Sequence, residues 1–157
     1  MTANDGLDDI DIRIAELLQE NGRMHRGDIA EKVELSLPAA SERLRKLEEK
    51  GVITHYAAVL DHKKVGLDIT AFIFVQIDTS SHYQNFIHKA KTHPDILECH
   101  AVTGDGSHLL KIRTQNTDKL EKLLSLIQSW QGVSGTRTSI VLSTAKETTA
   151  ISLKHMK

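Results

Sequence analysis

The spacing of apolar residues changes near residue 61, and this change constrains the fold more than any other feature of the chain. Before it, apolar residues such as Leu7, Ile10 and Ile14 recur every three or four positions, which is the period of an α-helix. From residue 69 onward, segments of strand-forming residues alternate with segments of helical periodicity. This succession predicts an α+β protein with an all-helical first domain and a mixed second domain.

Residues 1–60 are predicted to hold three short helices. Ser and Asp residues suited to helix caps stand at two of the starts, and glycines follow two of the ends. The helices are expected from Asp8 to Asn21, over about Gly27–Glu34 and from Ser36 to Lys50. Such a series with tight connections is typical of a helix-turn-helix domain. Val52–Leu60 is rich in β-forming residues and is expected to be a wing or a hinge strand.

Residues 61–66 are expected to be a linker, and residues 67–157 a second domain with a ferredoxin-like βαββαβ order. The expected elements are a strand over Ile69–Ile77, a helix from Tyr83 to near Pro94, strands over Leu97–Thr103 and His108–Arg113, a helix over Leu120–Trp130, a strand over Thr136–Thr144 and a last strand over Thr148–Leu153.

The first strand of this domain is apolar on both faces. Ile73 and Val75 lie on one face, and Phe72 and Phe74 on the other. Helices cover only one face of a ferredoxin-like sheet, so the second face needs another cover. A second subunit, the C-terminal tail or the N-terminal domain could supply it, and we expect self-association.

Composition and charge exclude several classes of protein. The longest strongly apolar run, Ala71–Val75, is too short to span a membrane, and the polar N-terminus does not resemble a secretory signal. A single cysteine, Cys99, cannot form an internal disulfide and suits the cytoplasm. The net charge is -1, and residues 1–60 hold 8 Lys/Arg against 12 Asp/Glu. Any nucleic-acid binding must therefore depend on a local patch.

The whole chain resembles the Lrp/AsnC family of transcription regulators. The segments that carry the resemblance, in order, are Leu7-Asp8-Asp9-Ile10-Asp11, Asn21-Gly22-Arg23, Leu35-Ser36, Glu42-Arg43-Leu44-Arg45-Lys46-Leu47-Glu48, Gly51-Val52-Ile53, Leu97-Glu98-Cys99-His100, Gly104-Asp105, Leu109-Leu110-Lys111, Gly132-Val133 and Thr136-Arg137-Thr138. The resemblance implies a DNA-binding helix-turn-helix domain, a hinge and an effector-binding domain. It also implies dimers that assemble further, commonly to octamers.

The third helix is the expected recognition helix for double-stranded DNA. Its apolar stripe leaves Ala39 and Arg43 on the outer face, and Arg43 is the first choice for a bidentate contact to guanine. The expected phosphate contacts are Ser36, Ser41, Arg45 and Lys46. By charge alone, this face could equally be a solvated surface, because Glu42, Glu48 and Glu49 alternate with the cations.

The resemblance implies that an effector, usually an amino acid, binds between subunits at the turn that joins the two central strands. The expected effector residues are Thr103, Gly104, Asp105, Gly106, Ser107, His108 and Ser139. A plain hairpin turn explains the two glycines equally well. The family often has an acid where Ser107 stands and aromatic residues where His108 and Ser139 stand. The ligand could therefore be an amino acid or another metabolite.

Neither a metal site nor a catalytic site is predicted. The nine histidines lack paired metal-ligand spacing, and neither a phosphate-binding loop nor a nucleophile motif is present. We therefore expect no cofactor and no enzymatic activity. Two alternatives stay open: an enzyme similar to siroheme decarboxylases, which resemble this two-domain fold, and a metabolite-binding module without DNA activity.

Overall fold

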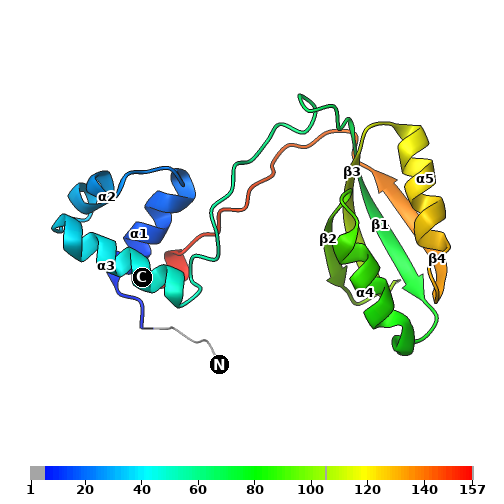
Figure 1. The fold of residues 1–157 in the computed structure, drawn as a ribbon, viewed down its shortest axis with the longest axis horizontal. Coiled ribbons are helices and arrows are strands. Elements are labelled where there is room, and N and C mark those ends of the chain that lie inside the picture. Colours follow the sequence, from blue (N-terminus) through cyan, green and yellow to red (C-terminus); the bar gives the residue numbers. More distant parts are fainter. Residues whose placement is uncertain (1–5, 105, 157) are drawn as a thin grey trace. The chain divides into compact units, whose positions relative to one another are not determined.

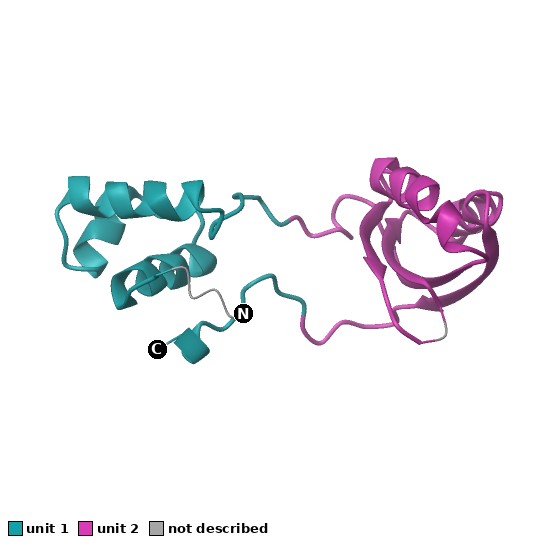
Figure 2. Cartoon of the chain, turned by 90° about the horizontal axis from the view of Figure 1, so that it is seen from below, with its two compact units in different colours: residues 1–59, 147–157 teal, residues 60–146 magenta. Residues whose placement is uncertain are grey.

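The computed structural model describes residues 6–104 and 106–156. It contains two compact units, Leu60–Lys146 and a unit that combines Met1–Val59 with Glu147–Lys157 (Figure 2). The sequence predicts one domain over residues 67–157, whereas the structure groups Glu147–Lys157 with the helical unit. The chain therefore passes between the two units twice.

The first unit contains α1 (Asp9–Glu20), α2 (Arg26–Lys32) and α3 (Leu37–Glu49), as Figure 1 shows. The predicted caps are confirmed. The Asp8 side chain accepts a hydrogen bond from the backbone N–H of Asp11 at 2.9 Å, and the Ser36 hydroxyl accepts one from Ala39 at 3.3 Å. These bonds satisfy backbone donors that a helix start leaves unpaired. The core of the unit lies among α1, α2 and α3 and includes Ile14, Leu18, Ile29, Leu44 and Leu47.

The strand expected over Val52–Leu60 is not formed, and residues 54–60 have no regular secondary structure. Instead, the first part of this segment is held against the helices. The backbone N–H of Ile53 donates to the Leu47 carbonyl at 3.1 Å, and the Tyr56 hydroxyl donates to the Glu48 carboxylate at 2.9 Å. Burial and the nearby carboxylate raise the pKa of Tyr56 to about 12. A strand needs a partner for its hydrogen bonds, and one protomer offers none here.

The second unit contains β1 (Ile69–Ile77), α4 (Tyr83–Thr92), β2 (Ile96–Ala101), β3 (His108–Thr114), α5 (Thr117–Gln128) and β4 (Val133–Ile140). The strands form an antiparallel sheet in the order β2-β3-β1-β4, so the predicted ferredoxin-like βαββαβ fold is confirmed. A strand over Thr148–Leu153 is absent; this part of the tail is irregular and leads into a short 3-10 turn at Lys154–Met156.

Helices α4 and α5 cover one face of the sheet (Figure 1). Ile73 and Val75 are fully buried on that face, against a core that includes Phe86 and Ile127. Phe72 and Phe74 alternate with them on β1 and are only half-buried. We call the face that carries these two phenylalanines the open face, because no helix of this unit covers it. None of the described helices is long and apolar enough to cross a membrane.

Candidate DNA-binding and effector-binding sites

Helix α3 turns one face to the core and the opposite face outward. Ala40, Leu44 and Leu47 are buried. Ser36, Ala39, Arg45 and Lys46 are exposed, as expected for DNA contacts, and Ser41 is half-buried. The start of α3 thus has a well-formed cap and accessible small side chains, and the exposed basic side chains lie farther along the helix.

Arg43 differs from its expected outward orientation. One of its guanidinium nitrogens, Nη1, lies 2.7 Å from Asp8 Oδ2 and 2.9 Å from Asp11 Oδ1, both at the start of α1. Hydrogen bonds to these carboxylates raise the pKa of Arg43, and the pKa of Asp8 is lowered by the Asp11 backbone N–H and by Arg43. The position of Arg43 around the helix axis explains this inward orientation. Residue 43 lies only about 40° around the helix from Leu47, so it borders the α1–α3 interface.

The other two cations of α3 also pair with carboxylates of the same helix. Arg45 donates to Glu42, with its Nη2 2.7 Å from Oε1, and also to Glu49. Lys46 Nζ lies 3.8 Å from the same Glu42 oxygen. Exposed pairs of this kind contribute little to stability, so another anion can replace either carboxylate at little cost. Arg45 and Lys46 on the outer face of α3 are therefore charge-balanced by Glu42 and Glu49.

The predicted effector turn is attached to the end of β1. The backbone N–H of Ser107 donates to the Val75 carbonyl at 3.0 Å, and its hydroxyl lies 3.2 Å from the same oxygen. Gly104 has φ +106°, and a Cβ on Gly106 would lie 3.3 Å from the Val75 oxygen. The positive φ thus favours glycine at position 104, and a side chain at position 106 would crowd the Val75 carbonyl. Thr103 is exposed, and Asp105 lies outside the described residues.

His108 points into the helix-covered side of the sheet and is fully buried. Its ring packs between Tyr83 and Phe86, with centroid distances of 4.9 Å and 5.0 Å. Burial lowers its pKa, so the ring is neutral at neutral pH. Its Nδ1 lies 3.0 Å from the Ser107 hydroxyl, and its Nε2 has no hydrogen-bond partner among the described residues.

The contacts of the Ser107 hydroxyl identify the tautomer of His108. If Nδ1–H donates to the hydroxyl, the hydroxyl proton can go to the Val75 carbonyl, and both contacts become hydrogen bonds. In the other tautomer the proton is on Nε2, and the hydroxyl must donate its single proton to Nδ1. The contact between the hydroxyl and the Val75 carbonyl is then no longer a hydrogen bond. The arrangement therefore favours a bare, hydrogen-bond-accepting Nε2.

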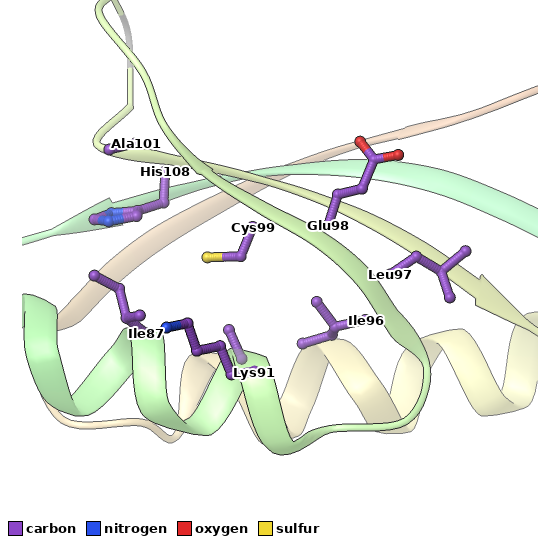
Figure 3. Close-up of a pocket in the computed structure, with 9 residues that line it drawn as sticks. Ile87, Lys91, Ile96, Leu97, Glu98, Cys99, Ala101 and His108 are labelled. Carbon is purple, nitrogen blue, oxygen red and sulfur yellow. The ribbon is translucent and has the colours of Figure 1, made fainter. Parts of the chain in front are cut away.

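A groove of about 290 Å³ lies between α4 and β2 and begins at His108. Figure 3 shows the Cys99 thiol and the Lys91 side chain reaching toward the same space. Burial raises the pKa of the Cys99 thiol, and the nearby Lys91 partly opposes that shift. The remaining lining is mostly apolar and includes Ile87, Ala90, Ile96 and Leu97. The groove combines one cation, one carboxylate (Glu98), one thiol and one imidazole with an apolar wall.

Sequence analysis missed Lys91 as a lining residue, because only the packing of α4 on β2 brings it to Cys99. Ser139 does not join the turn within one protomer. It pairs with Phe72 on the open face, whereas His108 pairs with Val75 on the covered face. The two β1 positions lie about 10 Å apart along the strand. Among the described residues, no three His, Cys, Asp or Glu side chains gather as a metal site.

Comparison with known proteins agrees with both domains. Residues 7–54 match the family model for a winged helix-turn-helix DNA-binding domain, and residues 70–151 match that for the Lrp/AsnC ligand binding domain. Together they define a DNA-binding transcriptional regulator with a ligand-binding domain. The chain belongs to the Lrp/AsnC family.

Relatives match this chain over nearly its whole length. The HTH-type transcriptional regulator FL11 of Pyrococcus horikoshii is 39% identical, over 94% of this chain and 97% of its own. The leucine-responsive regulatory protein of Haemophilus influenzae is 35% identical, over 96% of this chain and 93% of its own length. A Neisseria meningitidis transcriptional regulator, solved in complex with L-Met, superposes with a TM-score of 0.92 at 34% identity, over 96% and 99%. These relatives give no support to the siroheme-decarboxylase alternative.

Proposed function

We propose that this protein regulates transcription in the cytoplasm as an oligomer that reads DNA sequence with the outer face of α3. The observation that carries the proposal is the exposed, capped start of α3, where Ser36 and Ala39 are accessible and Arg45 and Lys46 follow about two turns after Ala39. In helix-turn-helix proteins the start of this helix lies at base edges in the major groove. Ser36, Ser41, Arg45 and Lys46 are assigned to phosphate contacts, which orient the helix.

Arg43 is proposed to reach a base only after it exchanges carboxylates for guanine. The Asp8 side chain is about half exposed, which makes exchange at that oxygen inexpensive, whereas Asp11 is 16% exposed. Guanine offers two acceptors that match the guanidinium geometry. Arg43 would then order α1 in the free protein and contact DNA in the complex.

Oligomerisation is part of the proposal because a single helical unit binds DNA weakly. Residues 1–60 carry a net charge of -4 by their Lys, Arg, Asp and Glu content, which disfavours contact with phosphates. Several linked units on neighbouring half-sites offset this through their high effective concentration. The open face around Phe72 and Phe74 is the proposed dimer surface, and an octamer is the proposed assembly.

The proposed effector is a small amino acid with an apolar side chain, held near the turn and the adjoining groove. Methyl groups of Ile87 and Ile96 suit an apolar side chain, and Lys91 suits a carboxylate. Ser107 adds no charge for the ammonium group. The L-Met complex of the Neisseria regulator makes methionine the first compound to test. No catalytic step is assigned to these residues.

A gel-shift titration with the DNA upstream of the protein's own gene tests the main proposal. Arg45→Ala and Lys46→Ala should each weaken binding on every sequence and lower its salt dependence, since each removes a phosphate contact. Lys122→Ala, which removes an exposed lysine of α5, serves as the control. Wild-type protein that selects no site in a genome-wide map of bound DNA would leave the metabolite-binding module as the better conclusion.

A further inference from the structure

The C-terminal tail, residues 147–156, is held on α1 by a reciprocal pair of hydrogen bonds. The Gln19 side-chain Nε2 donates to the Ile151 carbonyl at 3.0 Å, and the Ile151 backbone N–H donates to Gln19 Oε1 at 2.7 Å. One side-chain amide thus uses both of its functions on one backbone residue, as a neighbouring strand would. Because both bonds go to Ile151, the pair fixes which residue of the tail lies at Gln19.

Gln19 is well placed for this contact. It lies in the last turn of α1, and its neighbours Leu17 and Leu18 occupy the buried face, so Gln19 faces away from the core. Beyond Ile151 the tail folds into one short turn, with the Met156 N–H donating to the Leu153 carbonyl at 3.0 Å. Leu153 and Met156 are half-buried, whereas most of the tail is exposed.

The tail leaves the second unit directly from its sheet. The Val141 N–H donates to the Thr70 carbonyl at 2.9 Å, which continues the pairing of β4 with β1 one residue past Ile140. Residues 142–150 then connect the sheet to the contact at Gln19. The unit that contains the sheet is therefore joined to the DNA-binding unit at both ends of its own sequence, after Val59 and before Glu147.

We propose that the tail is a docking segment for α1, positioned by Gln19, and that it restricts the orientation of the DNA-binding unit. A unit attached through two connections samples fewer orientations than a unit attached through one. When one unit of the oligomer has bound a half-site, this restriction raises the effective concentration of the next unit at the next half-site. This consequence rests on the proposed function, whereas the docking itself does not.

Docking can be measured without DNA by millisecond hydrogen–deuterium exchange of the tail in the full-length protein. Gln19→Ala removes both bonds but keeps a good helix former in α1, and Ile151→Pro removes only the backbone donor. Each neutral hydrogen bond changes an equilibrium by about two- to tenfold. Exchange around Ile151 should rise by about fivefold or more in Gln19→Ala. Gln84→Ala, an exposed glutamine of α4, is the control. Equal exchange in wild type and Gln19→Ala would overturn the docking.

The consequence is measured by comparing DNA with one half-site and DNA with two half-sites. Gln19→Ala and Ile151→Pro should weaken binding to two half-sites several-fold, leave one half-site unchanged, and show no additional loss when combined. Equal loss on both DNAs would mean damage to the helical unit, and no loss on either would mean a tail without influence; both results overturn the proposed restriction. Wild-type protein that binds neither DNA would refute the proposed function and leave the exchange result standing.

Discussion

Replacing Arg43 with alanine separates its two proposed roles. In the free protein the guanidinium joins the start of α1 to α3 through Asp8 and Asp11. The Asp8 pair is half-exposed and is worth about 0–1 kcal/mol. The Asp11 pair is more buried. Charge-assisted hydrogen bonds contribute about 1.5–3 kcal/mol. Because Arg43 is partly exposed, we expect the Asp11 pair to contribute near the lower end of this range. Together the pairs should stabilise the helical unit by about 1–2 kcal/mol.

The stability part is measured by thermal unfolding. A loss of about 1–2 kcal/mol in a unit this small should lower its Tm by roughly 4–15 °C. Arg13→Ala is the matched control, because that exposed arginine makes one ion pair with Glu16 at 3.6 Å. The pKa of Asp8 is lowered from 3.8, so its share of the stabilisation is complete above that pH and is lost as the pH falls below it.

The DNA part is measured by gel shifts on the operator and on single-base variants of it. If Arg43 contacts guanine, Arg43→Ala should cost about 1–3 kcal/mol and relax the preference at one position. Asp11→Ala should destabilise the protein similarly but strengthen DNA binding, because it removes a competitor for the guanidinium. Unchanged base preference in Arg43→Ala, together with weaker binding in Asp11→Ala, would refute the exchange and leave Arg43 with a structural role.

Four further outcomes are expected. Ser107→Asp should bind amino acids about ten- to a hundredfold more tightly in calorimetry, because it adds a charge for the ammonium group; equal binding would show that Ser107 is not limiting. Light scattering at micromolar concentration should show no 17.5 kDa monomer, and Phe74→Glu on the open face should produce one; a wild-type monomer would refute the dimer surface. Gly132→Ala should lower stability by about 1–3 kcal/mol in denaturant unfolding, because φ is +88° and the new Cβ would lie 2.5 Å from His82; Gly104→Ala, in open space, should be milder. Because burial lowers the pKa of His108 from 6.5, the unfolded chain binds its proton first, so stability should fall as the pH drops below 6.5; His108→Gln should flatten this dependence.

Helix starts and the two faces of β1 were predictable because their causes are local. The Asp8 cap bonds to a residue three positions away, and the Ser36 cap does the same. The alternation of apolar residues along β1 identified its two faces before any neighbour was known. The Val52–Leu60 and Thr148–Leu153 strands were predicted wrongly from the same kind of signal, because β-forming residues make a strand only where another strand accepts their hydrogen bonds.

The chemistry of the sites was decided by contacts between distant parts of the chain. Arg43 has its carboxylate partners 32 and 35 positions away, and Gln19 bonds to a residue 132 positions away. The turn residue His108 became a core residue because pairing with Val75 turned its side chain toward α4. The same pairing rule put Ser139 on the other face, beside Phe72. Sequence by itself determined most of the helices and strands, since these follow from short-range hydrogen bonds and periodicity. Its motifs also carried the resemblance that implied the family and the candidate residues. Only the tertiary structure decided which charges and polar groups meet, since a long side chain takes its partner from whatever element packing brings within about 3 Å.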